Sequence, residues 1–235
     1  MTRRRWIADQ VVGDRAVLTG DHAAHLARVL RARIGQEYEI STGDRIRLGR
    51  VVSIADGQVE FELGEEVPQA SAPSVTLLLS VFKFDRMEWA IEKATELGVR
   101  QIVPIAARRS DAHLITAAGK RVERWRRLAL QASQQARRLA PPEVASPRPL
   151  KQVLASGQGT RIVLAEGERV ATLRQALASA GGEIAMAIGP EGGWAEDELA
   201  AFERSGWQAA SLGQNILRAE TAAIAALAVV MTELA

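Results

Sequence analysis

The chain has 235 residues, 47% of them hydrophobic and 25% charged, with a formal net charge of +2, which suits one large or two modest globular domains with a real core. It contains no cysteine, which excludes disulfides, thiolate nucleophiles and cysteine-ligated metals, and with three histidines and no HExxH motif we expect no metal site. No apolar run approaches the ~20 residues of a membrane helix and no signal-peptide pattern opens the chain, so we expect a cytoplasmic protein with no membrane partner.

Arginine dominates the basic residues, because only four of the 30 are lysine. The planar guanidinium of arginine, with its fork of N–H donors, suits phosphates and base edges. An arginine-favouring genome would give the same composition.

Residues 1–68 are predicted to form a small β-rich domain. Five segments alternate in polarity or carry β-branched residues, with GD, TGD and ADG turns between them: 5–12, 15–20, 37–43, 46–55 and 58–65. A helix over 22–30 interrupts them, and Asp21 can cap its N-terminus. The Pro/Ala/Ser-rich segment 67–74 indicates a domain boundary.

Residues 74–235 are predicted to form an α/β domain with a mostly parallel sheet, because strand and helix patterns alternate. The strands are expected over 75–82, 99–107, 160–166, 183–189 and 207–213. The helices are expected over 86–98, 120–139, 172–180, 195–206 and 219–235, with Trp89 and Trp125 on buried stripes.

The motif GPEGGW (189–194) follows a predicted strand and precedes a predicted helix. Gly189 lets the chain turn, Pro190 fixes φ, and Gly192 and Gly193 expose backbone N–H groups. Open α/β sheets bind ligands at such a position. The motif lacks the spacing of a dinucleotide fold or a P-loop, and Glu191 would repel a phosphate. A plain turn without a ligand is the alternative.

Two other predicted strands end in similar stretches, VLAEGE (163–168) and LGQNILRAETAA (212–223). Three strand ends that combine glycine with a carboxylate could form one pocket. Backbone groups there could read a purine edge, and a carboxylate could bind ribose hydroxyls or an ammonium group.

The motifs GPEGGW and LG..ILRAETA together resemble the C-terminal signature of the SPOUT methyltransferases, specifically the RsmE family. The resemblance extends over most of the chain, through the following blocks: 5–7, 25–31, 83–104, 108–110 and 124–147. The chain departs from the family pattern at Gln214-Asn215, where a basic residue or Pro-Arg is usual, and at Gln134, where Glu is usual.

The resemblance implies an α/β SPOUT fold for residues 74–235, with a mostly parallel sheet and a deep C-terminal trefoil knot. It also implies a small N-terminal PUA-like β-barrel (1–68) that binds RNA. Family members are homodimers that methylate N3 of a uridine in 16S rRNA, in the decoding region of the small ribosomal subunit. They use S-adenosylmethionine and no metal. The matching cofactor-binding positions are Leu164, Ala165, Glu166, Gly189, Pro190, Glu191, Gly192, Gly193, Leu212, Gly213, Gln214, Ile216, Leu217, Arg218 and Ala222.

Arg218 and Glu220 are the expected catalytic residues. N3–H of uracil is a weak acid, so a base or a cation that stabilises the uracil anion is required. Arg218 is expected to supply the cation or to grip the target phosphate. Glu220 is expected to orient Arg218, with a role as base as the alternative; a simple surface salt bridge between the two is also compatible with the sequence.

Basic residues in both domains are expected to bind the RNA: Arg3, Arg4, Arg5, Arg31, Arg109, Arg124, Arg127 and Arg138. Two other functions stay open. The protein could be a SPOUT methyltransferase for a ribose 2′-OH or another RNA target, or a non-catalytic RNA-binding assembly factor.

Overall fold

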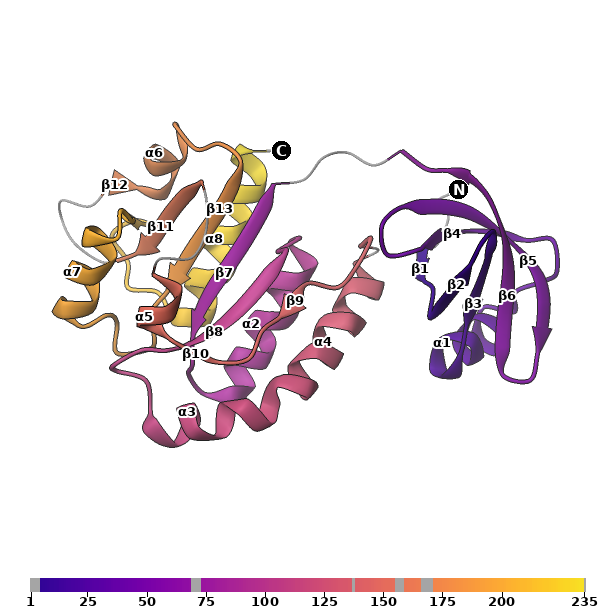
Figure 1. Ribbon diagram of the computed structural model, residues 1–235, viewed down its shortest axis with the longest axis horizontal. Coiled ribbons are helices and arrows are strands. Elements are labelled where there is room, and N and C mark those ends of the chain that lie inside the picture. Colours follow the sequence, from indigo (N-terminus) through magenta and orange to yellow (C-terminus); the bar gives the residue numbers. More distant parts are fainter. Residues whose placement is uncertain (1–4, 69–72, 137, 155–158, 166–170, 235) are drawn as a thin grey trace. The chain divides into compact units, whose positions relative to one another are not determined.

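The computed structural model describes residues 5–68, 73–136, 138–154, 159–165 and 171–234 (Figure 1). The chain divides into two compact units, one comprising Met1–Ala70 and Ser133–Pro141, the other Ser71–Ala132 and Pro142–Ala235. No helix within the described ranges combines the length and the apolar character needed to cross a membrane.

The first unit contains a curled six-stranded sheet (Figure 1). Its order is β1-β4-β5-β6-β3-β2, with β1 and β4 parallel and the other neighbours antiparallel. Alternate side chains of the strands, among them Ile40, Val59 and Phe61, are fully buried and form the core. The strands are β1 (Arg5–Ile7), β2 (Gln10–Val12), β3 (Arg15–Leu18), β4 (Glu37–Ser41), β5 (Ile46–Ala55) and β6 (Gln58–Glu66).

The helix of this unit differs from the sequence-based prediction. It begins as α1 (Gly20–Ala24) and continues as a π-helical turn, η1 (His25–Val29). Thr19 is the N-cap residue, without a side-chain cap, and Asp21 lies inside the first turn, so the prediction that Asp21 caps the helix is wrong. Shortly after the π turn, Arg31 adopts a φ of +52°, a region that residues other than glycine seldom enter.

The segment Ser133–Pro141 packs with the first unit although it is remote from it in sequence. The Ser41 hydroxyl donates a hydrogen bond to the carbonyl of Leu139. Gln134 Nε2 lies 3.2 Å from His22 Nδ1, within hydrogen-bonding distance. The sequence carries no obvious sign of this grouping, which places nine residues of the expected 74–235 domain with the N-terminal unit.

The second unit is built on a sheet in which every pairing between described strands is parallel. The order is β10-β8-β7-β13-β11-β14-β12, with β9 beside β8. Its strands are β7 (Ser74–Ser80), β8 (Gln101–Ala106), β9 (Glu143–Val144), β10 (Arg148–Pro149), β11 (Thr160–Leu164), β12 (Ala171–Thr172), β13 (Glu183–Ile188) and β14 (Gln208–Ser211).

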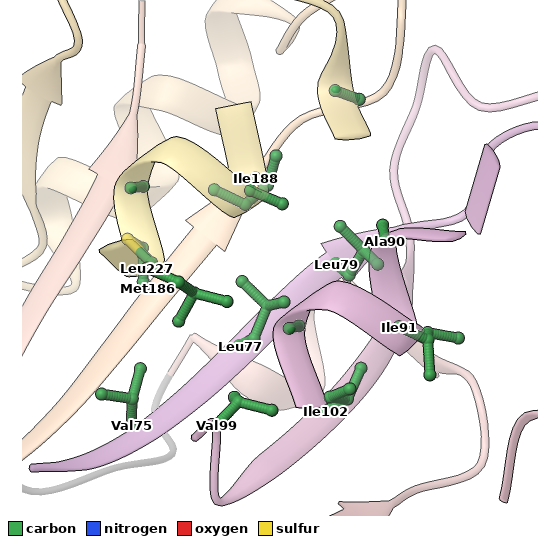
Figure 2. Close-up of a cluster of buried hydrophobic side chains, with 14 of the residues drawn as sticks. Val75, Leu77, Leu79, Ala90, Ile91, Val99, Ile102, Met186, Ile188 and Leu227 are labelled. Atoms are coloured by element: carbon green, nitrogen blue, oxygen red, sulfur yellow. The ribbon is translucent and has the colours of Figure 1, made fainter. Parts of the chain in front are cut away.

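Helices cover both faces of this sheet, as expected for buried parallel strands. On β7, Leu77 and Leu79 pack with α2, α4, α6 and α8, and Leu78 packs with α5 and α7 on the other face. Figure 2 shows the first of these cores, where Met186 and Leu227 lie close to Leu77. The helices are α2 (Phe84–Glu96), α3 (Ala112–Ala118), η2 (Gly119–Arg121), α4 (Val122–Gln135), α5 (Leu150–Val153), α6 (Leu173–Leu177), α7 (Glu196–Arg204) and α8 (Ala219–Glu233).

The two tryptophans expected in the core differ in burial. Trp125 on α4 is fully buried, as predicted. Trp89 on α2 is 46% exposed, so its predicted burial is wrong. The reason is its angular position: Met87, Ala90, Ile91 and Ala94 form the buried stripe of α2, and Trp89 lies nearly opposite that stripe, on the solvent-facing side.

Candidate active site

Three neighbouring strands of the second sheet end beside one cavity. β11 pairs with β13 on one side and with β14 on the other, all in parallel, so their carboxyl ends lie at the same edge. The cavity has a volume of about 480 Å³, which falls in the range of roughly 300–1,000 Å³ typical of small-molecule sites. The loops after the three strands therefore meet around a space large enough for a small organic ligand.

The structure brings most of the predicted cofactor-binding residues together around this cavity. Those that line it are Leu164, Ala165, Gly189, Pro190, Glu191, Gly192, Gly193, Leu212, Gly213, Ile216, Leu217 and Ala222. Gln214 and Arg218 lie in the same loop as Leu217 but are not among the lining residues. Glu166 lies outside the described residues.

Other lining residues were missed by sequence reasoning: Arg109, Ile188, Trp194, Leu199, Ala210, Ser211, Asn215 and Ala219. Most of them are sequence neighbours of predicted positions, so a wider window around each motif would have found them. Arg109 is different, because it was expected to bind RNA and follows β8, which is two strands away from β13 in the sheet.

The GPEGGW loop is held in shape by internal contacts. The N–H of Gly193 donates a hydrogen bond of 2.8 Å to the carbonyl of Pro190, and Gly193 has a φ of +68° that favours glycine. A Cβ on Gly189 would lie 3.2 Å from Nε1 of Trp194, so the backbone passes close over the indole. The glycines are therefore required by a positive φ in one case and by close packing in the other.

The loop is also fixed to the segment that follows β8. Arg109 donates a hydrogen bond of 2.9 Å to the carbonyl of Gly192. The carboxylate of Glu198, on α7, accepts the backbone N–H of Arg108 at 2.8 Å and that of Ala195 at 2.9 Å. Glu198 is 8% exposed, and these two hydrogen bonds satisfy a carboxylate that would be costly to bury unpaired.

The cavity wall combines apolar side chains with exposed backbone. The charged lining residues are Arg109 and Glu191, and the described residues contain no cluster of His, Asp or Glu able to hold a metal ion. Arg108 is neutralised by Asp197 at 2.5 Å, whereas the guanidinium of Arg109 has no carboxylate partner within the described ranges. Such a wall suits an organic ligand with hydrogen-bonding edges more than a polyphosphate.

The two expected catalytic residues differ sharply in their surroundings. Arg218 occupies the N-cap position of α8 without a side-chain cap, its side chain is exposed, and it has no partner among the described residues. Glu220 is 6% exposed and pairs with Arg86 of α2 at 3.6 Å. In the described structure Glu220 thus contacts Arg86 and not Arg218, and it does not line the cavity.

The arginines expected to bind RNA are also not equivalent. Arg5 pairs with Glu39 at 2.9 Å, and Arg124 makes a bidentate pair with Glu88 at 2.7 and 2.8 Å. Arg138 is half-buried, and desolvation lowers the pKa of its guanidinium to about 10. Arg31 and Arg127 are exposed. Arg3 and Arg4 lie outside the described residues.

Comparisons with known proteins agree on one family. A family model described as an RNA methyltransferase domain matches residues 69–231. The ribosomal RNA small subunit methyltransferase E of Mycobacterium bovis is 34% identical over 92% of this chain and 85% of its own length. That of Rickettsia conorii is 30% identical over 90% of this chain and 87% of its own length.

Solved structures agree with the sequence comparison. The ribosomal RNA small subunit methyltransferase E of Neisseria gonorrhoeae, bound to S-adenosyl methionine, superposes with a TM-score of 0.85 at 28% identity, covering 98% of both chains. A Legionella pneumophila structure in complex with the same cofactor gives 0.82 at 26% identity, over 99% of this chain and 98% of that one. The fold is thus the α/β SPOUT fold with an N-terminal barrel. The chain belongs to the RsmE family, that of the ribosomal RNA small subunit methyltransferases E.

Proposed function

We propose that this protein transfers the methyl group of S-adenosylmethionine to N3 of a uridine in 16S rRNA, in the decoding region of the small ribosomal subunit. The observation that carries the proposal is the cavity at the joint edge of β11, β13 and β14, in a chain whose relatives are named as small subunit rRNA methyltransferases. The C-terminal part is proposed to follow the trefoil-knotted path that the RsmE resemblance implies.

The cavity residues fit this cofactor. Bound S-adenosylmethionine supplies an activated methyl group on a positive sulfonium, so the protein chiefly has to position and desolvate it. Backbone groups at Ala165, Gly189–Gly193 and the lining residues of the loop after β14 can offer hydrogen bonds to a purine edge, beside apolar side chains such as Leu164 and Leu199. Glu191 favours a cationic ligand.

Arg218 is proposed to act on the uridine. Its neighbours Leu217 and Ala219 both line the cavity, and its own side chain is exposed without a partner among the described residues. A guanidinium in this place can stabilise the anion that forms when N3 loses its proton, or hold the target phosphate. Arg109 lines the cavity and has no carboxylate partner among the residues that the structure describes, so it can contribute to the same task.

The N-terminal barrel (1–68) is proposed to bind RNA through the segment Arg28–Ile34. Arginines in the strands, such as Arg15 and Arg50, are ion-paired with glutamates. Arg28, Arg31 and Arg33 are exposed and have no carboxylate partner within the described part of the chain. Uncompensated cations are the ones free to replace counterions on a phosphate backbone.

Two further features of this segment support a contact with RNA. Val29 is 65% exposed and Ile34 is 72% exposed, which gives the cationic surface an apolar component able to contact unstacked bases. The π turn His25–Val29 and the positive φ of Arg31 are local irregularities of a kind that is frequent at functional sites. The uridine must be presented unpaired, because its N3 is occupied inside a duplex.

The protein is proposed to act as a homodimer. α8 is apolar around most of its circumference, and half-buried side chains remain on it in the described structure: Ala222, Ile224, Ala225, Ala228, Val229 and Met231. Ile216, at the cavity wall, is 81% exposed. A second copy that covered these residues would complete the active site, and sedimentation of the purified protein tests the stoichiometry.

The reaction is proposed to take place in the cytoplasm, on 16S rRNA free or within the small subunit. The test incubates the protein with unmodified small subunits or free 16S rRNA and labelled S-adenosylmethionine, followed by nucleoside analysis. Labelled N3-methyluridine is expected. A label on a ribose 2′-OH would replace the proposal with another methyltransferase activity, and RNA binding without cofactor binding or product would indicate an assembly factor.

A further inference from the structure

The ion pair between Arg86 and Glu220 joins the first turns of two helices at the edge of the sheet where the cavity lies. Arg86 is the third residue of α2, and Glu220 is the second residue of α8. The two helices pack against each other. Arg86 Nη1 lies 3.6 Å from Glu220 Oε1, and the side chains are 31% and 8% exposed.

The placement of Arg86 is locally unfavourable. The N-terminus of a helix carries a partial positive charge, which stabilises a carboxylate and disfavours a guanidinium. Glu220 therefore suits the start of α8, but Arg86 opposes the dipole at the start of α2. A cation that opposes the helix dipole is expected to have a compensating interaction elsewhere. The ion pair of Arg86 with Glu220 is such an interaction.

The pair is also poorly built as a stabilising salt bridge. At 3.6 Å it exceeds the length of a charge-assisted hydrogen bond. Glu220 Oε2 is buried and has no hydrogen-bond partner in the described structure. An unpartnered buried carboxylate oxygen is destabilising, so stability alone does not account for a glutamate at this position.

Glu220 lies in the middle of the residues that shape one wall of the cavity. Ala219 and Ala222, on either side of it in α8, line the cavity, as does Leu217. Arg218, two residues before Glu220, occupies the N-cap position of the helix. Any shift of the first turn of α8 would therefore move both the wall and the guanidinium proposed to act on the uridine.

We infer that Arg86 is a positioning residue for methyl transfer, which acts through Glu220 to fix the start of α8 and thereby the place of Arg218. The inference rests on the proposed function of Arg218. In this role Arg86 and Glu220 act through the position of α8 and not by contact with the reactants; neither of them lines the cavity.

The inference is tested by measuring methyl transfer in four variants: Arg86→Met, Arg86→Lys, Glu220→Gln and the double variant Arg86→Met/Glu220→Gln. Arg86→Met keeps most of the side-chain volume without the charge. We expect kcat to fall about tenfold to a hundredfold, the scale of a misplaced reacting group, while the Kd for S-adenosylmethionine changes less than about threefold. Arg86→Lys should recover a large part of kcat, and the double variant should lose no more than the worse single variant.

A second arginine–carboxylate pair supplies the matched control. Arg174 Nε lies 3.2 Å from Glu233 Oε1, at the opposite end of α8. Arg174→Met removes this pair between α6 and the last residue of α8, at the end of α8 remote from Arg218, and its kcat should equal that of the wild type. Thermal denaturation of every variant shows whether it is folded at the assay temperature, and kcat is compared only among folded variants.

Three results would overturn the inference: a kcat of Arg86→Met within twofold of the wild type, additive losses in the double variant, or an equal loss in Arg174→Met. Failure of the proposed function is recognised separately, because the wild type itself would then form no N3-methyluridine.

Discussion

The indole Nε1 of Trp194 donates a hydrogen bond of 2.9 Å to the backbone carbonyl of Leu164. Leu164 is the last residue of β11, and Trp194 closes the GPEGGW loop after β13, so the bond joins the ends of two neighbouring strands at the cavity. Buried polar groups require such partners. The bond satisfies the indole and at the same time fixes the loop against β11.

Trp194→Phe should weaken cofactor binding. The ring would keep its edge-to-face packing on Phe202 but lose the hydrogen bond to Leu164, at a cost of about 1–3 kcal/mol for the carbonyl left unsatisfied. Because the loop lines the cavity, we expect the Kd for S-adenosylmethionine to rise at least about tenfold, which corresponds to roughly 1.4 kcal/mol. Calorimetric titration measures the Kd, and urea denaturation measures the free energy of unfolding.

The matched control is Trp207→Phe. Trp207 donates a similar hydrogen bond of 3.1 Å to the carbonyl of Leu154 and packs on the same Phe202, but it does not line the cavity. We expect a similar loss of stability with an unchanged Kd. Equal changes of Kd in the two variants would mean that the effect of Trp194 on the cofactor site is only a general effect of stability.

Gly189→Ala should also impair the cavity. The added Cβ would lie 3.2 Å from Nε1 and 3.3 Å from Cε2 of Trp194, and the indole cannot retreat without losing its bond to Leu164. Overpacking of this kind typically costs about 1–3 kcal/mol. Gly119→Ala is the control, because nothing lies within 4 Å of its added Cβ and its backbone is helical. A Gly189→Ala protein with wild-type Kd and stability would contradict the close packing of this loop.

Arg218→Ala should separate catalysis from cofactor binding. The side chain is exposed and does not line the cavity, so the Kd for S-adenosylmethionine should stay within about threefold. Loss of a group that stabilises a developing anion lowers kcat by about 10²–10³-fold. Single-turnover methylation of saturating RNA measures the chemical step. The exposed Arg204, at the end of α7, gives the control Arg204→Ala; a wild-type rate for Arg218→Ala would remove Arg218 from the mechanism.

Much of this architecture could be predicted from the sequence because its signals are local. Period-two and near-continuous apolar runs marked the main strands, and glycine-rich ends after β13 and β14 marked the cavity. The adjacency of β11, β13 and β14 was not visible in any one segment, but the rule that ligands bind at carboxyl strand ends brought their loops together.

The features that escaped prediction depend on contacts between remote residues. No sequence pattern around Arg86 predicts its ion pair with Glu220, and none around Leu139 predicts its hydrogen bond with Ser41. The paired state of Arg124 with Glu88 is likewise a tertiary property. A count of arginines therefore overestimates the RNA-binding surface, since ion pairs neutralise several of them.

The difference between ion-paired and unpaired arginines predicts how the affinity for RNA depends on salt concentration. Each phosphate contact in a protein–RNA complex contributes roughly 0.7–0.9 to the slope of log K against log salt concentration. The triple variant Arg28→Ala/Arg31→Ala/Arg33→Ala removes three exposed arginines that have no carboxylate partner in the described structure. We expect weaker binding of 16S rRNA and a slope lower by about 2–3, measured by filter binding over a series of salt concentrations.

The control for this experiment changes three exposed arginines of the same unit that are already ion-paired. Arg15 lies 3.5 Å from Glu60, Arg45 lies 2.9 Å from Asp44, and Arg50 lies 3.4 Å from Glu37. The two triple variants lose the same formal charge, so any difference between them reports where the RNA lies and not the net charge of the protein. Because the paired arginines have carboxylates as their counterions, their removal should leave the slope nearly unchanged. Equal slopes for the two variants would show that the segment Arg28–Ile34 is not the RNA-binding surface of the barrel.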